Sequence, residues 1–450
     1  MSRRELLHTA SAGLAVSAAA AVLPALGASA QNPRSSGPSK SALSPESMPK
    51  AWSREEMQRR WQNVRQRMKE SHLDCLIVPQ HRMGAMIAER IEGDADVQYL
   101  TGIPAGWVVL PYEGKVTAIT TGQIKPLWGE KKPVAGVIQF VDSAQDLDVR
   151  FVGEGLWSRV IIDRLRELNM TQARIGIGDL EGTFRNEEGG VNYTTYDRIR
   201  KALPQVQVDS AVELLWQVKL VHSPEEIVAL EKATEVSEAG LAAMMRTTRP
   251  GAIHRDVWLA VYDAMVQASG ERPWRLALRA GEDGNTSLGF PLDEVFKPGQ
   301  IMNQEISGSV LGYGSQVNHS VLIGSPAPAD WQSAAQYCLD IFHGLVDMAA
   351  PGKNVNELTE YYAQKVKARG GKPGGVFLHS GGLGDLPRWG PGRAEGAGII
   401  LQAGMVFDVK PSGPIKGASP MPQFGDSVVI TEKGARRLGK RKMEVVALGA

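Results

Sequence analysis

Residues 219–226 read KLVHSPEE, and they combine several signals for the start of a helix. Ser223 is a capping residue, Pro224 suits the first helical position, and Glu226 stands where it completes a capping box with the serine. We therefore predict a helix that begins here. Its apolar face follows at helical spacing and is formed by Ile227, Leu230 and Val236.

Downstream of this helix, apolar runs punctuated by glycine alternate with amphipathic segments. Two further helices are predicted near 330–349 and 355–369. A domain of strands and helices therefore begins near residues 210–222. Its predicted strands are Gln300–Ile306, Val317–Ile323, Met405–Val409 and Ser427–Thr431.

Upstream, strands and helices also alternate, which predicts an α/β domain that ends near Val208. The charged segment Ser53–Glu70 has helical spacing. The fold class is therefore α/β (α+β) in two domains. The predicted strands here are Leu73–Val78, Val97–Gly102, and a hairpin formed by Trp107–Leu110 and Lys115–Thr120.

The first thirty residues carry the features of an export signal. Arg3-Arg4 is followed by an Ala- and Leu-rich stretch, and Ala28-Ser29-Ala30 offers the small residues that a signal peptidase requires. The apolar stretch is short, which disfavours a membrane anchor. Gln31–Ser47 is rich in Ser and Pro and predicts a flexible leader. We expect a periplasmic or secreted protein, exported by the twin-arginine route, that does not bind a membrane.

Composition excludes several classes of function. The chain has 50 Lys and Arg against 49 Asp and Glu, so a broad basic face for nucleic acid is not expected. Two cysteines exclude a four-cysteine zinc module and leave a Cys75–Cys338 bridge open. Gly176-Ile177-Gly178 lacks the third glycine of a dinucleotide motif, because position 181 is Glu. The sequence contains no P-loop, zincin or nucleophile-elbow motif either.

Two groups of short motifs carry a resemblance over nearly the whole mature chain. In the first half they are Arg59-Arg60, Leu73–Val78 and Tyr99–Gly102. In the second half they are Lys219–Glu226, Arg279–Gly281 with Asn285, Glu305–Tyr313, Leu378–Gly384, and Gly404–Phe407 with Asp426–Glu432.

The motifs of the second half resemble the catalytic domain of the pita-bread family, which includes aminopeptidase P, prolidase, methionine aminopeptidase and the metal-free creatinase. Those of the first half resemble the amino-terminal domain that creatinase, prolidase and aminopeptidase P share. The resemblance implies a creatinase-like amino-terminal domain at 51–215 and a pita-bread catalytic domain at 216–450. A signal peptide at 1–30 and a leader at 31–50 precede them.

The resemblance also locates the family's metal site. In the metallopeptidases of this family, two Asp, one His and two Glu hold two divalent cations. Here one carboxylate is kept and an ammonium stands among the former ligands. An ammonium repels a nearby dication by several kcal/mol at an effective dielectric constant of about 20. We expect no metal and no other cofactor. The corresponding positions are Glu305, Gln316, His379, Lys410 and Gly425.

Creatinase also acts without metal, but this chain departs from it too. A His that carries the proton in creatinase has no counterpart here, because Glu282–Pro291 contains no His. The resemblance therefore does not imply that this protein acts on creatine as creatinase does.

Four residues are candidate proton carriers. His379 keeps the position of a family ligand, and imidazole titrates near neutral pH. Lys410 is either a fixed cation in place of the metal or a structural ion-pair partner of Glu305 or Asp408. Glu305 is either a general base or only that partner. His319, at the end of a family strand motif, is the fourth candidate.

Other residues are candidates for binding a small-molecule substrate. An arginine binds a carboxylate bidentately, and aromatic walls suit planar or cationic ligands. Trp107, Trp274 and Trp389 fall near positions that border the cavity in the family. Family members with this amino-terminal domain are commonly homodimers, so the resemblance also implies a homodimer. The candidates are Gln316, Asp385, Arg388, Trp389, Trp107 and Trp274.

Three functions remain open from the sequence. The first is a metal-independent hydrolase or lyase that cleaves a C–N or C–C bond of a small, non-peptide molecule. The second is a Xaa-Pro metallopeptidase with an altered metal site. The third is a catalytically silent binding protein.

Overall fold

The computed structural model describes most of the two domains. The expected signal peptide and the first part of the leader lie outside the described residues. Within the described residues, no helix is long and apolar enough to cross a membrane. The described residues are 43–80, 95–103, 106–121, 146–152, 156–182, 188–281, 291–373, 375–384, 387–391, 393–394, 398–412 and 422–449.

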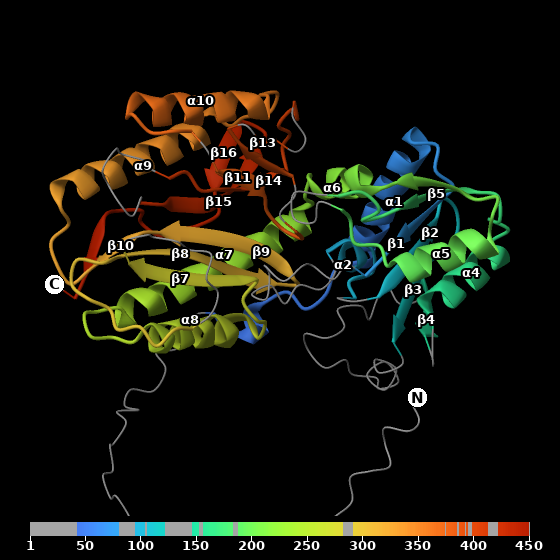
Figure 1. Cartoon of the computed structure of the whole chain (residues 1–450), viewed down its shortest axis with the longest axis horizontal. Coiled ribbons are helices and arrows are strands. Elements are labelled where there is room, and N and C mark those ends of the chain that lie inside the picture. The colour runs from blue at the N-terminus through green and yellow to red at the C-terminus, as the bar shows by residue number, and fades with distance from the viewer. Residues whose placement is uncertain are drawn as a thin grey trace, which may run out of the picture. The chain divides into compact units, whose positions relative to one another are not determined.

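A six-stranded sheet with strand order β4-β3-β2-β1-β5-β6 forms the amino-terminal domain (Figure 1). The hairpin predicted around residues 107–120 is confirmed, since β2 and β3 pair antiparallel. The strands are β1 (Cys75–Val78), β2 (Trp107–Pro111), β3 (Val116–Thr121), β4 (Leu147–Val152), β5 (Arg174–Ile177) and β6 (Gln207–Ser210). The helices are α1 (Arg54–Glu70), α4 (Trp157–Glu167), α5 (Tyr193–Ala202) and α6 (Val212–Lys219), with a 3-10 turn at η2 (Pro45–Ser47).

The prediction of a strand at Val97–Gly102 is wrong, because this segment forms the helix α2 (Ala95–Thr101). Its β-branched and aromatic residues favour a strand locally, but short apolar runs do not distinguish the two structures. Tertiary contacts decide the outcome. Gln98 donates to the Leu311 carbonyl, and Tyr99 donates to the Val218 carbonyl.

A second, larger sheet has the strand order β13-β12-β11-β14-β15-β9-β8-β10-β17, with β7 beside β8 and β16 beside β15. Helices α7 and α8 pack on the β7–β9 half, and α9 and α10 cover the β11–β15 half (Figure 1). The strands are β7 (Arg275–Gly281), β8 (Ile301–Val310), β9 (Tyr313–His319), β10 (Val321–Ile323), β11 (Leu378–Ser380), β12 (Arg388–Gly390), β13 (Arg393–Ala394), β14 (Val406–Val409), β15 (Phe424–Thr431), β16 (Gly434–Arg437) and β17 (Val446–Leu448). The helices are α7 (Pro224–Thr247), α8 (His254–Ser269), α9 (Ala329–Met348) and α10 (Val355–Ala368).

The capping signals at the start of α7 act as the sequence predicts. The Ser223 side chain accepts from the Glu226 amide, and the Glu226 carboxylate accepts from the Ser223 amide. Glu226 also contacts Arg59 of α1 at 2.6 Å, so the capping box ties this helix to the amino-terminal domain. The two motifs therefore meet in space, although they are far apart in sequence.

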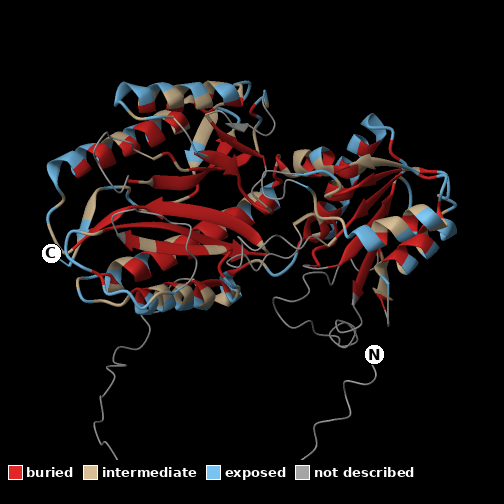
Figure 2. Cartoon of the chain, viewed as in Figure 1, coloured by how far each residue is buried: buried red, intermediate tan, exposed pale blue. Residues whose placement is uncertain are grey.

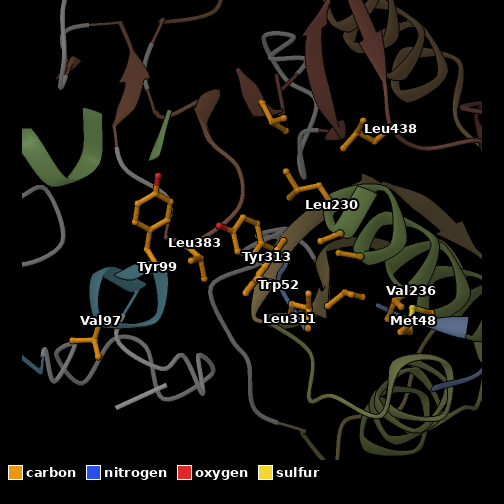
Figure 3. Packing of buried hydrophobic residues seen from close by; sticks show 14 of the residues in the cluster. Met48, Trp52, Val97, Tyr99, Leu230, Val236, Leu311, Tyr313, Leu383 and Leu438 are labelled. Carbon is orange, nitrogen blue, oxygen red and sulfur yellow. The ribbon is translucent and has the colours of Figure 1, made fainter. Parts of the chain in front are cut away.

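Both sheets are buried along most of their strands, whereas the helices expose one side (Figure 2). Around the junction of α1 with β9, the core contains Trp52 and Tyr313, whose ring centroids lie 4.9 Å apart (Figure 3). Cys75 and Cys338 are free and buried in different core clusters. The structure therefore contains no bridge between them.

Candidate functional site

Strand pairing brings the five positions that the resemblance assigns to the family's metal ligands onto one face of the second sheet. Gln316 pairs with Ser307, which lies two residues after Glu305 on β8 and therefore on the same face. Gly425 pairs with Asn318, which lies on the same face as Gln316. Because side chains alternate along a strand, these residues point away from the face on which α7 packs.

The other half of the sheet contributes to the same face. His379 pairs with Asp408, and Lys410 directly follows β14 on the same side as Asp408. The alternate residues Phe407 and Val409 pack into the core with α9 and α10. We call the resulting group the inner polar cluster. It consists of Arg275, Glu305, Gln316, His379, Arg388, Asp408, Lys410 and Ser427.

Glu305 is the centre of a buried group of charges. Lys410 Nζ donates to its Oε1 at 2.8 Å, and Arg275 Nε donates to its Oε2. The three side chains are only 11–12% exposed. Burial by itself raises the pKa of Glu305, but the charges of Lys410 and Arg275 outweigh it and hold this pKa well below its ordinary value. Glu305 is therefore a carboxylate fixed in its ionised form, which makes it a weak general base.

Lys410 has the opposite electrostatic balance. Burial lowers the pKa of its ammonium group, and the ion pair with Glu305 limits that fall. A buried ammonium is a fixed positive charge that stabilises an anion at low dielectric constant. By the family resemblance, Lys410 stands at the position of a metal-binding glutamate, and it carries a charge of the opposite sign.

The fifth family position, Gly425, lies directly against Lys410. A Cβ at residue 425 would lie 2.6 Å from the Val409 carbonyl oxygen and 2.8 Å from Lys410 Cβ. A side chain here would therefore displace the backbone that carries Lys410. The chain at residues 409–410 therefore leaves no room for a glutamate side chain at residue 425.

The donor set does not suit the two metal ions that the family implies. Two divalent cations of the hard type need several oxygen ligands, mostly carboxylates. Both oxygens of Glu305 are engaged by cations, and the remaining family positions offer one amide, one imidazole, one ammonium and no side chain. Within the described residues, no group of three or more His, Cys, Asp or Glu could hold a metal.

Asp408 is a buried carboxyl group at the centre of the cluster. Burial raises its pKa to about 7, against the opposing effects of the Ser427 hydroxyl and of Lys410. The Ser427 hydroxyl donates to Oδ1, and His379 Nδ1 lies 3.7 Å from Oδ2. A carboxyl group that titrates near neutral pH is suited to proton transfer at that pH.

His379 stands beside this carboxyl group and is 1% exposed. Its Nδ1 lies 3.0 Å from the Ser380 carbonyl oxygen, which can only accept a hydrogen bond. The geometry therefore assigns the proton of the neutral ring to Nδ1 and the basic lone pair to Nε2. His379 and Asp408 form an adjacent base and acid.

Besides Gln316, two more of the predicted substrate-binding residues lie at the cluster. Arg388 is buried and pairs with His379 across β11 and β12, so it is on the cluster's face. Trp274 packs against Gly314, which lies two residues before Gln316 on β9. A Cβ built on Gly314 would lie only 2.5 Å from the Trp274 ring, so the ring lies directly against the glycine. Asp385 lies outside the described residues.

The structure does not bring His319 or two of the tryptophans to the cluster. His319 is three residues after Gln316 and therefore faces the other side of β9, where its Nε2 contacts the Glu444 carbonyl at 2.8 Å. Burial, together with Arg441, lowers its pKa to about 4. Trp389 lies in the core beneath α9 and α10, with its ring 5.5 Å from Phe407. Trp107 lies in the core of the amino-terminal sheet.

Three members of the cluster were not predicted as site residues, namely Arg275, Asp408 and Ser427. For Asp408 a signal exists, because it is two residues before Lys410 on a predicted strand and must share its face. Arg275 and Ser427 depend on strand register, which the sequence alone does not define.

The fold and the site define a two-domain α/β protein whose second sheet carries a buried acid, base and cation. Residues 60–221 match the Creatinase/Prolidase N-terminal domain, and residues 228–432 match Metallopeptidase family M24. The chain belongs to the pita-bread family of creatinase, prolidase and aminopeptidase P. The predicted family and fold class are thereby confirmed.

Relatives within this family differ in their activities. The Xaa-Pro dipeptidase of Pyrococcus furiosus is 23% identical over 263 residues, which cover 58% of this chain and 74% of the dipeptidase. The dimethylsulfoniopropionate lyase DddP of Roseovarius nubinhibens is 25% identical, over 53% of this chain and 56% of the lyase. Among solved structures, dipeptidase PepE from Mycobacterium ulcerans has a TM-score of 0.70 and 19% identity, covering 89% of this chain and all of that chain.

Proposed function

We propose that the protein is a metal-independent enzyme that cleaves a C–N or C–C bond of a small, non-peptide molecule by acid–base chemistry. One observation carries this proposal. The ammonium of Lys410 lies 2.8 Å from Glu305, at the position where the family's peptidases have a carboxylate ligand. This arrangement supplies a fixed positive charge in the place where those peptidases use metal ions.

The chemistry follows from the neighbouring groups. His379 Nε2 is the basic nitrogen that takes a proton from the substrate or from an attacking water. Asp408, with its raised pKa of about 7, is an acid that returns a proton to the leaving group near neutral pH. Lys410 stabilises the negative charge that develops between these two steps. The same groups serve a hydrolase and a lyase, and the family includes a protein named as a lyase.

Metal analysis combined with a turnover screen tests the proposal. The mature protein, purified without chelator, is expected to contain no stoichiometric manganese, zinc or iron. Substrate consumption from a pool of small metabolites is expected to be unaffected by EDTA and to be about 100-fold slower in His379→Ala. Two equivalents of a transition metal, with activity lost on chelation and regained on metal addition, would contradict it.

A Xaa-Pro peptidase is the second candidate, and the names of several relatives favour it. In that case the protein would cleave Xaa-Pro dipeptides and would require metal ions. A catalytically silent binding protein would instead retain ligands from the pool without consuming them. The same two measurements therefore separate the three functions.

We also propose that export takes the protein to the periplasm and that it acts as a homodimer.

A further inference from the structure

Three buried hydroxyl groups connect Asp408 to helix α7. Ser427 Oγ contacts Asp408 Oδ1, and Ser315 Oγ lies 2.7 Å from Ser427 Oγ. Thr234 Oγ1 lies 2.5 Å from Ser315 Oγ and 2.8 Å from the Leu230 carbonyl oxygen, one turn earlier in α7. The three hydroxyl-bearing residues are at most 1% exposed. We call them the hydroxyl chain, which has a carboxyl group at one end and a backbone carbonyl group at the other.

The direction of each hydrogen bond in the hydroxyl chain depends on the others. Each hydroxyl group has one proton to donate, and the Leu230 carbonyl only accepts. If Thr234 donates to this carbonyl, Ser315 must donate to Thr234. Ser427 must then donate to Ser315, and its contact with Asp408 requires a proton on the carboxyl group. This arrangement therefore belongs to the protonated acid.

The opposite direction uses the same positions of the oxygen atoms. An ionised Asp408 only accepts, so the Ser427 hydroxyl donates to it and accepts from Ser315. Ser315 then accepts from Thr234, whose proton turns away from the Leu230 carbonyl. In both arrangements Ser427 Oγ accepts from the backbone N–H of residue 316, at 3.0 Å. Only hydroxyl protons have to move between the two arrangements.

We infer that Thr234, Ser315 and Ser427 form a reversible hydrogen-bond chain that gives Asp408 a partner both when it holds its proton and when it has released it. The inference rests on the proposed function, because it takes Asp408 as the acid of the reaction. The three hydroxyl residues are positioning residues, since they act through Asp408. A buried donor without a partner is unfavourable, and the hydroxyl chain avoids one in both states.

Other groups also act on Asp408, and none of them belongs to the hydroxyl chain. His379 Nδ1 lies 3.7 Å from Oδ2, whereas Lys410 and Asp426 act through their charges. A substitution of Thr234 removes none of these groups, so it tests the hydroxyl chain by itself. The charged and titratable groups around Asp408 are Lys410 on β14, His379 on β11, Asp426 on β15, and the Glu305–Arg275 pair that Lys410 joins.

Thr234→Val is the decisive variant, because valine keeps the shape of threonine and lacks the hydroxyl group. With Asp408 protonated, the Ser315 hydroxyl loses its acceptor and becomes a buried donor without a partner. With Asp408 ionised, Ser315 still donates to Ser427. The variant should therefore be destabilised more at pH 5.5 than at pH 8.5, on the two sides of the pKa of about 7.

Urea unfolding at these two pH values measures the effect without a substrate. One ordinary hydrogen bond corresponds to a factor of about 2 to 10 in an equilibrium constant. Relative to wild type, Thr234→Val should therefore raise the unfolding equilibrium constant by a factor that is about 2- to 10-fold larger at pH 5.5 than at pH 8.5. In the Asp408→Asn background this difference should disappear, because an amide does not titrate.

Two control variants separate the hydroxyl chain from a general loss of packing. Thr234→Ser keeps the hydroxyl group, so its effect on stability should be the same at both pH values. Thr247→Val removes a hydroxyl group from the same helix. Among the described residues, this hydroxyl contacts only backbone carbonyl groups, with Ala243 at 2.9 Å. Its effect should also be independent of pH.

The inference is wrong if Thr234→Val is destabilised equally at both pH values, or more at pH 8.5. It is also wrong if the difference persists in the Asp408→Asn background. Should Thr234→Val fail to fold, Ser315→Ala replaces it, because Ser427 then loses its acceptor only when Asp408 is protonated. These results are distinct from a failure of the proposed function, which a stoichiometric metal or the absence of turnover would overturn.

Discussion

The Lys410–Glu305 ion pair predicts a change of stability with an unusual pH dependence. Unit charges 2.8 Å apart attract by about 6 kcal/mol at an effective dielectric constant of about 20, before the cost of desolvation is subtracted. The substitution Lys410→Glu replaces this attraction by a second carboxylate beside Glu305. Arg275 neutralises only one of the two, so the folded variant must bury an unbalanced charge or take up a proton.

Proton uptake sets the size of the effect. Neutralising a carboxyl group of ordinary pKa 4.5 costs about 3 kcal/mol at pH 7 and less than about 1 kcal/mol at pH 5. We therefore expect Lys410→Glu to be about 3 kcal/mol less stable than wild type at pH 7. About 2 kcal/mol of this loss should be regained at pH 5, because the folded variant then binds its proton almost without cost.

The wild-type protein is expected to respond in the opposite direction. The pKa of Glu305 lies below its ordinary value, so the stability that this group contributes is present above pH 4.5. It is lost as the pH falls toward the lowered pKa. Acidification should therefore lower the stability of the wild-type protein and raise the stability of Lys410→Glu.

Urea unfolding, followed by tryptophan fluorescence at several values from pH 3 to pH 7, measures both responses. Lys353→Glu is the control, because it places two carboxylates together on an exposed helix, where the effect should stay below about 1 kcal/mol. The reasoning would be refuted if Lys410→Glu unfolded with the wild-type midpoint at pH 7. A destabilisation that did not change with pH would equally contradict a buried carboxylate pair.

Four further predictions concern single residues. His379→Ala should lower kcat on the identified substrate by about 100-fold and change KM less, as steady-state kinetics can show. Asp408→Asn should lower kcat/KM, because an amide cannot supply the proton, and it should abolish the pH dependence that Asp408 causes. In the wild type, kcat/KM should fall as the pH rises through about 7, because only the protonated carboxyl group acts as the acid. Gly425→Ala should cost about 1–3 kcal/mol in urea unfolding, since its Cβ would lie 2.6 Å from the Val409 oxygen. Trp389→Phe should lower stability and leave KM unchanged, because the ring lies in the core and not at the cluster.

Much of the fold could be predicted from local signals, because those signals agree with the tertiary structure. The capping box at Ser223 depends only on residues within one helical turn, and it forms as expected. The hairpin at residues 107–121 depends on two β-prone runs and a short turn. The helix α2 was missed, because its buried position, and not its composition, determines its structure.

Site residues that lie in a family motif could be predicted from the sequence. Residues that reach the site only through strand pairing were harder to predict. Glu305 and Lys410 follow from the motifs, and the structure places them together. His319 shows what periodicity adds, since its odd separation from Gln316 puts it on the opposite face of the strand. Arg275 could be predicted as a member of the site only from the register of β7 with β8. This register depends on contacts between residues that are distant in sequence.

The altered ligand positions depend on one another. Lys410 is tolerated in a buried place because Glu305 balances it, and Glu305 stays ionised because Lys410 and Arg275 hold it. Gly425 faces the Val409 carbonyl oxygen and the Cα and Cβ atoms of Lys410, which leave no room for a side chain there. Restoring one metal ligand therefore creates a steric or electrostatic conflict with the residues that remain, and it leaves the donor set still too small for a cation. The charges of the cluster balance one another in part, and several substitutions at once would be needed to give it the donor set of the family's metal site.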